Sequence, residues 1–138
     1  MNRCTLLLVS GILLLSTGCS TMKNANIADE FTRSTKGYIK LLRWHELESA
    51  LVTYVSVPLQ ERYREGMTAA EDVKIVDYRV KREECDPVRG EGTVQMELDY
   101  YRPPSVTVRT VTDLQKWSYE QIGETGSWRL QTMLPDFR

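Results

Sequence analysis

Four side chains in the sequence are suited to proton transfer: Asp77, Asp99, Asp113 and the single histidine, His45. A general acid or base must reach the proton that it moves, and burial must tune its pKa. Asp77 and Asp99 alternate with apolar residues, so the pattern predicts that both carboxylates face solvent. Asp113 instead falls in the same alternation class as Trp117. It is expected to share an inward face with that indole unless a bulge resets the phase.

His45 follows Trp44 at a core-facing helical spacing, where the sequence leaves two interpretations open. The imidazole either packs or caps a helix end, or it acts as a base beside a pocket. No His–Asp pair at motif spacing, nucleophile elbow or glycine-rich phosphate loop occurs in the sequence. The pattern therefore favours a protein without catalytic activity, with Asp113 or His45 as the acid or base of the enzymatic alternative.

A different chemistry belongs to the thiol of Cys19, which closes a short apolar segment. Arg3 precedes an apolar run over residues 5–15, and the small residues 16–18 (Ser-Thr-Gly) separate that run from the cysteine. A membrane-spanning helix needs about 20 apolar residues, roughly twice the length of this run. The length and the flanking residues favour a cleaved signal over a permanent anchor. The whole segment resembles a bacterial lipoprotein signal with its lipobox.

The lipoprotein resemblance implies a specific attachment and location. Residues 1–18 would be removed as a signal peptide, and Cys19 would carry a thioether-linked diacylglycerol and an amide-linked third acyl chain. Two or more acyl chains give lasting anchorage, so the lipid bilayer is the expected partner of Cys19. Ser20 resembles the default sorting residue of outer-membrane lipoproteins, which places the domain in the cell envelope, facing the periplasm. The open alternative is an ordinary secretory signal with Cys19 as an incidental thiol.

The 120 residues that follow the predicted signal are enough for one domain with its own core. Removal of Arg3 leaves 17 Lys and Arg residues against 19 Asp and Glu residues, a net charge of −2. This balance argues against nucleic acid as a partner, because no basic excess exists to release counterions. One remaining cysteine, Cys85, and one histidine cannot supply four ligands to a structural metal, so no metal or cofactor is expected.

The spacing of apolar residues predicts helices first and strands afterwards. The small polar residues after Cys19 predict a lipidated tether over 19–26, with Asn26 as the N-cap of the first helix. From residue 71 onward the apolar period changes to two, with turn residues between the runs. The expected helices run over 27–45 and 46–54, either continuous or jointed near Trp44 and His45, and an ambiguous stretch follows over 59–70. The expected strands run over 76–81, 94–100, 106–121 (bent or bulged near Thr110) and 128–134.

Helices followed by an antiparallel meander predict an α+β domain, in which the helices pack on one face of a strongly bent four-stranded sheet. Two groups of residues resemble segments of small bacterial nuclear transport factor 2-like (cystatin-like) domains. They are the helix junction 42–50 (Leu-Arg-Trp-His-Glu-Leu-Glu-Ser-Ala), and the last hairpin with its tail, 115–119 (Gln-Lys-Trp-Ser-Tyr), 126–130 (Gly-Ser-Trp-Arg-Leu) and 134–137 (Leu-Pro-Asp-Phe). The resemblance implies such a cone-like domain over residues 27–138. Because that architecture hosts isomerases, dehydratases and proteins without chemistry, it does not assign the function.

Aromatic side chains are the expected contact sites for a ligand or partner: Tyr100, Tyr101, Trp117 and Trp128. Adjacent strand residues face opposite ways, so one of Tyr100 and Tyr101 must leave the core. We therefore predict a membrane-anchored envelope lipoprotein that acts as a non-enzymatic binding module for an envelope protein or a small apolar ligand. Two alternatives stay open: a small isomerase or hydratase-like enzyme that uses one of the two candidate bases, and a structural subunit that forms a homodimer through the outer sheet face.

Overall fold

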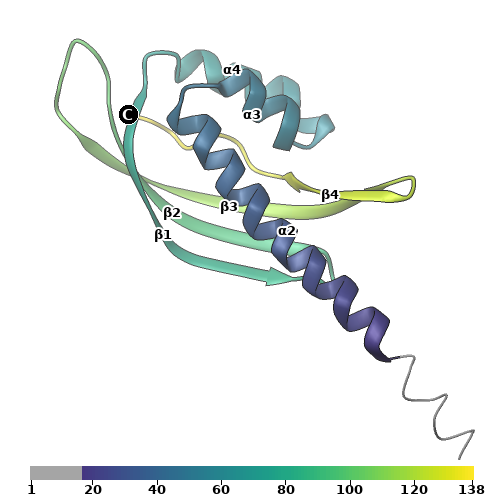
Figure 1. Cartoon of the computed structure of the whole chain (residues 1–138). Coiled ribbons are helices and arrows are strands. Elements are labelled where there is room, and N and C mark those ends of the chain that lie inside the picture. The colour runs from purple at the N-terminus through teal and green to yellow at the C-terminus, as the bar shows by residue number, and fades with distance from the viewer. Residues whose placement is uncertain (1–16) are drawn as a thin grey trace, which may run out of the picture.

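The computed structural model describes residues 17–138, so all but the last two residues of the predicted signal peptide lie outside the described part of the chain. The described chain is a set of helices followed by one antiparallel sheet in the order β1-β2-β3-β4 (Figure 1). This confirms the predicted α+β class. The elements are α2 (Thr17–Arg43), α3 (Leu47–Tyr54), the short 3-10 helix η1 (Val57–Leu59), α4 (Gln60–Ala69), β1 (Lys74–Asp86), β2 (Glu91–Tyr101), β3 (Arg109–Ile122) and β4 (Thr125–Leu130).

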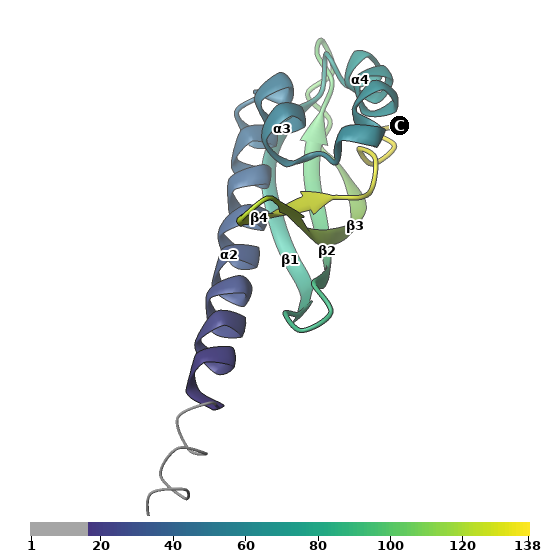
Figure 2. The same ribbon diagram turned by 90° about the vertical axis from the view of Figure 1, so that its right-hand side faces the viewer.

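The helices cover one face of the sheet and leave the other open to solvent (Figure 2). Helix α2 runs along β1 and also meets β4, while α3 and α4 close one end of the same face. The buried positions of α2 recur at helical spacing, as expected for an amphipathic helix. The core they form with the sheet contains Phe31, Tyr38, Ile39, Leu42, Leu51, Tyr63, Val94, Met96, Leu98, Tyr100, Trp117, Trp128 and Leu130.

Phe31 and Trp128 join α2 to the sheet. Their ring centroids lie 4.8 Å apart, and the Trp128 indole Nε1 donates a hydrogen bond to the Ile27 carbonyl at 2.9 Å. Phe31 also sits directly over Gly92 of β2, where a Cβ would overlap the phenyl ring. The absence of a side chain at Gly92 is therefore what lets the helix approach β2 this closely.

The start of α2 differs from the sequence prediction. The segment predicted as a tether, 19–26, is helical, and the predicted N-cap Asn26 lies within the helix. No Gly or Pro stands between Cys19 and Lys36 to interrupt a helix that packing already stabilises further along. Most side chains of 19–26 are exposed, and this end of α2 projects beyond the sheet (Figure 1).

His45 ends α2. It adopts φ 60°, and its backbone N–H donates to the Leu42 carbonyl at 3.0 Å, while the Glu46 N–H donates to the Leu41 carbonyl at 2.8 Å. These two hydrogen bonds form a Schellman motif, in which the residue with positive φ is usually Gly. The left-handed conformation costs a non-glycine residue about 1–2 kcal/mol.

Replacement of His45 by Gly is therefore expected to stabilise the fold. The gain from relieving the left-handed conformation exceeds the extra unfolded-state entropy of Gly, roughly 0.5–1 kcal/mol, so a net increase of about 0.5–1 kcal/mol in the free energy of unfolding should follow. Urea denaturation of the wild type and of His45→Gly measures this difference. Lower stability in the variant would mean that the imidazole itself makes a contact worth more than the backbone strain.

Strand β1 carries the irregularities of the sheet. Its register against β2 shifts between Ile75 and Asp77 and again between Val80 and Arg82. Of the bulge or strong bend predicted near Thr110, the bulge is excluded, since β3 pairs with β2 from Arg109 to Ser118 without a shift. Bulges and charged side chains at the outermost strand oppose pairing with another sheet, which explains their place in β1.

Other boundaries also differ from the sequence prediction, and β1 and β2 are both longer than the runs 76–81 and 94–100. The ambiguous stretch 59–70 forms α4 despite Gly66, and Tyr63 of this helix is buried. The strand predicted over 106–121 begins at Arg109. The last strand ends at Leu130 rather than 134, because residues after it turn away to run beneath α4 (Figure 1). Each difference reflects packing against distant parts of the chain, which outweighs local pattern.

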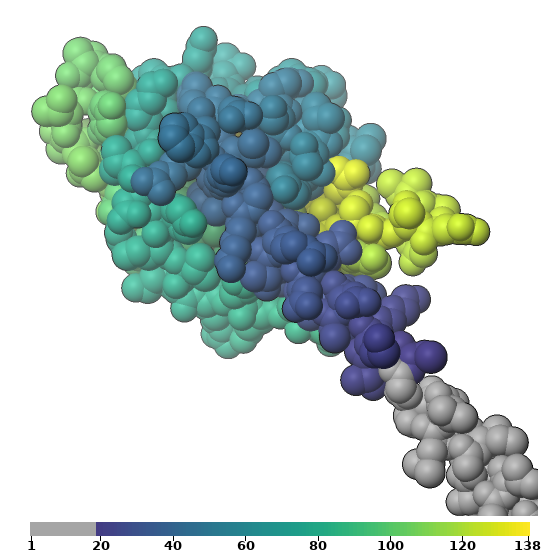
Figure 3. All heavy atoms as spheres, in the orientation of Figure 1, coloured from purple at the N-terminus to yellow at the C-terminus, as the bar shows by residue number. Residues whose placement is uncertain are grey.

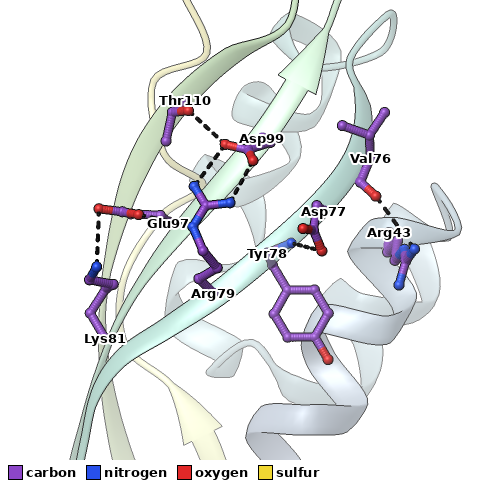
Figure 4. A network of polar contacts seen from close by, with 9 residues as sticks. All are labelled: Arg43, Val76, Asp77, Tyr78, Arg79, Lys81, Glu97, Asp99 and Thr110. Atoms are coloured by element: carbon purple, nitrogen blue, oxygen red, sulfur yellow. Dashed lines mark hydrogen bonds and ion pairs between the residues drawn. The ribbon is translucent and has the colours of Figure 1, made fainter.

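On the open face of the sheet, ion pairs link the neighbouring strands β1 and β2 (Figure 4). The Arg79 guanidinium donates to both Asp99 carboxylate oxygens, at 2.6 and 3.0 Å, and to Glu97 at 3.2 Å. Thr110 on β3 donates to Asp99 at 2.6 Å. Hydrogen bonds from Arg79 and Thr110 lower the pKa of Asp99 to about 2. Asp77 lies on the same face and accepts only from the neighbouring Tyr78 amide. Both aspartates thus face outward, as the alternation predicted.

Candidate functional site

Asp113 is a buried carboxyl group in the apolar interior. It lies on β3 opposite Met96 of β2, with 3 % of its surface exposed. The regular pairing of β3 keeps Asp113 on the same inward face as Trp117, which is 2 % exposed. Burial raises the pKa of Asp113 to about 6, and a hydrogen bond from Gln115 partly offsets that rise.

Gln115 links Asp113 to Trp117 along the inward face of β3. Its side-chain amide donates to the Asp113 carboxylate at 2.6 Å, and its carbonyl oxygen accepts from the Trp117 indole N–H at 3.0 Å. The three residues are spaced two apart, so all point the same way from one strand. Gln115 was not among the site residues predicted from the sequence. Its position between Asp113 and Trp117, at the same inward alternation, could have identified it as a buried polar residue.

Two tyrosines from the helices complete the buried polar group. The hydroxyls of Tyr38 on α2 and Tyr63 on α4 lie 2.7 Å apart in a hydrogen bond. Desolvation is the main cause of the raised pKa of both phenols, and the charge of Asp113 raises each further. The pKa of Tyr63 also reflects the hydrogen bond from Tyr38, which opposes the rise. We refer to these five buried residues as the polar cluster: Asp113, Gln115, Trp117, Tyr38 and Tyr63.

The polar cluster contains an acid of the kind that catalysis needs, but a substrate cannot reach it. A carboxyl group with pKa about 6 could exchange a proton near neutral pH. Asp113 and Gln115 are, however, sealed from solvent and hydrogen-bonded to each other. A base must reach the proton of a bound substrate. The Asp113 carboxyl group is therefore enclosed in the core and is not presented to a ligand.

The other candidate base is His45, whose backbone forms the end of helix α2. It is half-buried at the junction of α2 and α3, 68 residues before Asp113 in the sequence. The structure does not bring His45 together with Asp113 in any hydrogen bond or ion pair within residues 17–138. The Schellman motif is formed by the backbone around His45, so it places this residue at the helix end without assigning a role to the imidazole.

The four aromatic residues predicted as contact sites separate into two groups. Tyr100, Trp117 and Trp128 are buried side chains of the core, so they do not present a contact surface. Tyr101 is half-buried on the opposite face from Tyr100, as adjacent strand residues must be. Of the four, Tyr101 therefore retains the exposure that a contact role requires.

Cys19 is exposed in the first turns of α2, and Cys85 is half-buried near the β1–β2 turn. An open hollow of about 400 Å³ beside Cys19 is lined by Met22, Ile27 and Tyr119 among others. Within residues 17–138, none of the helices has the length and apolar character that a membrane crossing demands. The same part of the chain holds no cluster of three or more His, Cys, Asp or Glu side chains able to bind a metal ion.

Comparisons with protein-family models, curated proteins and solved structures find no match to this chain. The likeness to nuclear transport factor 2-like domains therefore stays an expectation from sequence segments. The site has to be judged on its own geometry.

Proposed function

We propose that this protein is a lipid-anchored binding module of the cell envelope, held at the outer membrane by acyl chains on Cys19 and without enzymatic activity. The observation that carries the proposal is the position of Cys19. The thiol is exposed at the end of α2 that projects from the domain, directly after an apolar segment of signal length. Acyl chains on Cys19 could therefore enter a bilayer without displacing any packed residue of the core.

The filled interior supports binding over catalysis. The aromatic residues that could have lined a pocket pack against one another instead: the Trp117 ring lies 5.7 Å from Tyr38 and 6.3 Å from Phe31, centroid to centroid. The hollow between α2 and β1 measures about 170 Å³, less than the roughly 300 Å³ typical of small-molecule sites. A partner at the surface therefore fits the domain better than an apolar ligand inside it.

A homodimer through the outer sheet face finds less support. That face is dominated by charged and hydroxyl side chains such as Arg79, Glu97 and Asp99, which already satisfy one another. The large apolar side chains exposed at this alternation of β3 are Leu114, at 65 %, and Ile122, at 63 %. Stable dimer interfaces are more apolar than this, so the outer face is better suited to remain solvated.

Cys19→Ser is expected to abolish lipid attachment. The serine hydroxyl cannot take the place of the thiolate in a thioether, so the variant should incorporate no radiolabelled fatty acid and should leave the detergent phase in phase partitioning. The wild type should be labelled and should start at a modified Cys19 by mass spectrometry.

Cys85→Ser is the matched control, because it removes the other thiol of the described chain without touching α2. It should be labelled like the wild type. An unmodified mature start, a first residue other than Cys19, or equal labelling of Cys19→Ser would reject the anchoring proposal.

A further inference from the structure

The connection between β2 and β3, residues 102–108, forms a lobe at the opposite end of the molecule from Cys19 (Figures 1 and 3). Within this lobe, Val106 is 85 % exposed and Val108 is 54 % exposed. Apolar side chains presented on a projecting loop are a recurrent feature of contact surfaces. The lobe is thus the part of the domain that reaches farthest from the proposed anchor.

A small hollow of about 80 Å³ lies at the base of this lobe. Its lining combines cationic, hydroxyl and aromatic side chains, and no carboxylate is among them: Tyr100, Tyr101, Arg102, Ser105, Thr107 and Arg109. The Tyr100 hydroxyl already donates to the Arg138 carbonyl, and Ser105 Oγ accepts from the Thr107 amide. Guanidinium groups carry donors only, so the arginines of the hollow suit an acceptor.

The two arginines of the hollow differ in their charge balance. Arg102 forms an ion pair with Asp72, and its guanidinium also donates to the Ala69 and Phe137 carbonyls at 3.0 and 2.8 Å. Arg109 is exposed and forms no ion pair within residues 17–138. The free positive charge of the hollow is therefore the single charge of Arg109.

We infer that this hollow binds a carboxylate, supplied by an acidic side chain of a partner protein that also covers Val106 and Val108. The inference rests on the proposed binding role of the domain and names the chemistry of the partner. One unpaired guanidinium matches the single charge of a carboxylate and offers the planar, two-pronged geometry that carboxylates accept. The neighbouring valines give the same partner an apolar surface to bury.

Titration with sodium acetate tests this inference on the full chain purified in detergent. Acetate should shift the amide signals of Ser105, Thr107 and Arg109 in nitrogen–proton correlation spectra, beyond any effect of sodium chloride at the same ionic strength. Inorganic phosphate at the same ionic strength is a separate arm, which tests whether the hollow prefers a planar carboxylate over a tetrahedral anion. Larger shifts with phosphate would overturn the carboxylate assignment.

Arg109→Gln should raise the dissociation constant for acetate about tenfold or more, the usual effect of losing a charged hydrogen bond. Arg62→Gln is the matched control, since Arg62 is an exposed arginine on α4 outside the hollow. It should bind acetate like the wild type. Shifts that chloride reproduces, or that survive in Arg109→Gln, would reject the site. The outcome is independent of acylation, so failure here and failure of the Cys19 test are separate results.

Discussion

Asp113→Asn is expected to increase the free energy of unfolding at pH 7 by about 3 kcal/mol. Asp113 has a folded-state pKa of about 6 because burial disfavours its charge, against 3.8 for the free carboxyl group. Each pKa unit corresponds to about 1.4 kcal/mol, so ionised Asp113 destabilises the folded state by about 3 kcal/mol. Asparagine has nearly the same shape, keeps an oxygen that accepts from Gln115, and carries no charge.

The same substitution should change how stability depends on pH. Below pH 4 the carboxyl group is protonated in both states and has no differential effect. Between about pH 4 and 6 the folded state holds the proton and the unfolded state does not, so wild-type stability falls as pH rises. Above pH 6 both states are ionised and the full loss persists. Asp113→Asn should remove this fall.

Chemical denaturation at pH 4, 5, 6 and 7 measures both effects. Asp77→Asn is the control, because Asp77 is an exposed carboxylate that bonds only to a neighbouring amide, and surface changes of this kind stay within about 0.5 kcal/mol. If wild-type stability did not fall between pH 4 and 6, the charged form of Asp113 would be satisfied by partners beyond Gln115. The polar cluster would then need a functional explanation.

Trp128→Ala should produce the largest loss of stability, about 3–5 kcal/mol. Trp128 is 1 % exposed and contacts Phe31 and Tyr119 at centroid distances of 4.8 and 5.5 Å. Its truncation leaves a large cavity between α2 and β4 and also leaves the Ile27 carbonyl without its indole donor. Domains of this size have about 5–15 kcal/mol in total, so the variant should unfold at markedly lower urea concentration.

Trp44→Ala supplies the comparison with the same residue type. Trp44 is 69 % exposed at the end of α2, so its removal should change the urea midpoint little. Equal effects at the two positions would mean that the core does not depend on the contact between Trp128 and α2. Tryptophan fluorescence and circular dichroism together separate local change at the indole from unfolding of the chain.

The sheet could be predicted from the sequence, and its irregularities could not. Alternation such as Val94-Met96-Leu98 fixes both the strand and its buried face, because side chains alternate across a pleated sheet. The shifts in β1 are invisible to that pattern: Val80 alternates correctly yet is exposed at the outer strand. The early start of α2 was missed because small polar residues have no marked helix preference of their own.

The buried acid of the candidate site was predictable and its surroundings were not. The inward direction of Asp113 follows from its even spacing to Trp117 along one strand. Tyr38 and Tyr63 approach it from helices 75 and 50 positions earlier in the chain. No local pattern encodes contacts of that range, because they arise only when the helices pack onto the sheet.

One consequence of α2 concerns height above the bilayer. The residue proposed to be acylated and the residues that fill the core belong to one unbroken helix, with Ile27 fastened to Trp128. Residues 19–26, which project beyond the sheet, span about 12 Å of this helix. A lipidated Cys19 would therefore keep the packed part of the domain separated from the bilayer surface by this projecting helical segment. A partner would then meet the distal lobe only in a layer close to the membrane. Its diffusional encounter with the protein would therefore be confined largely to the membrane plane.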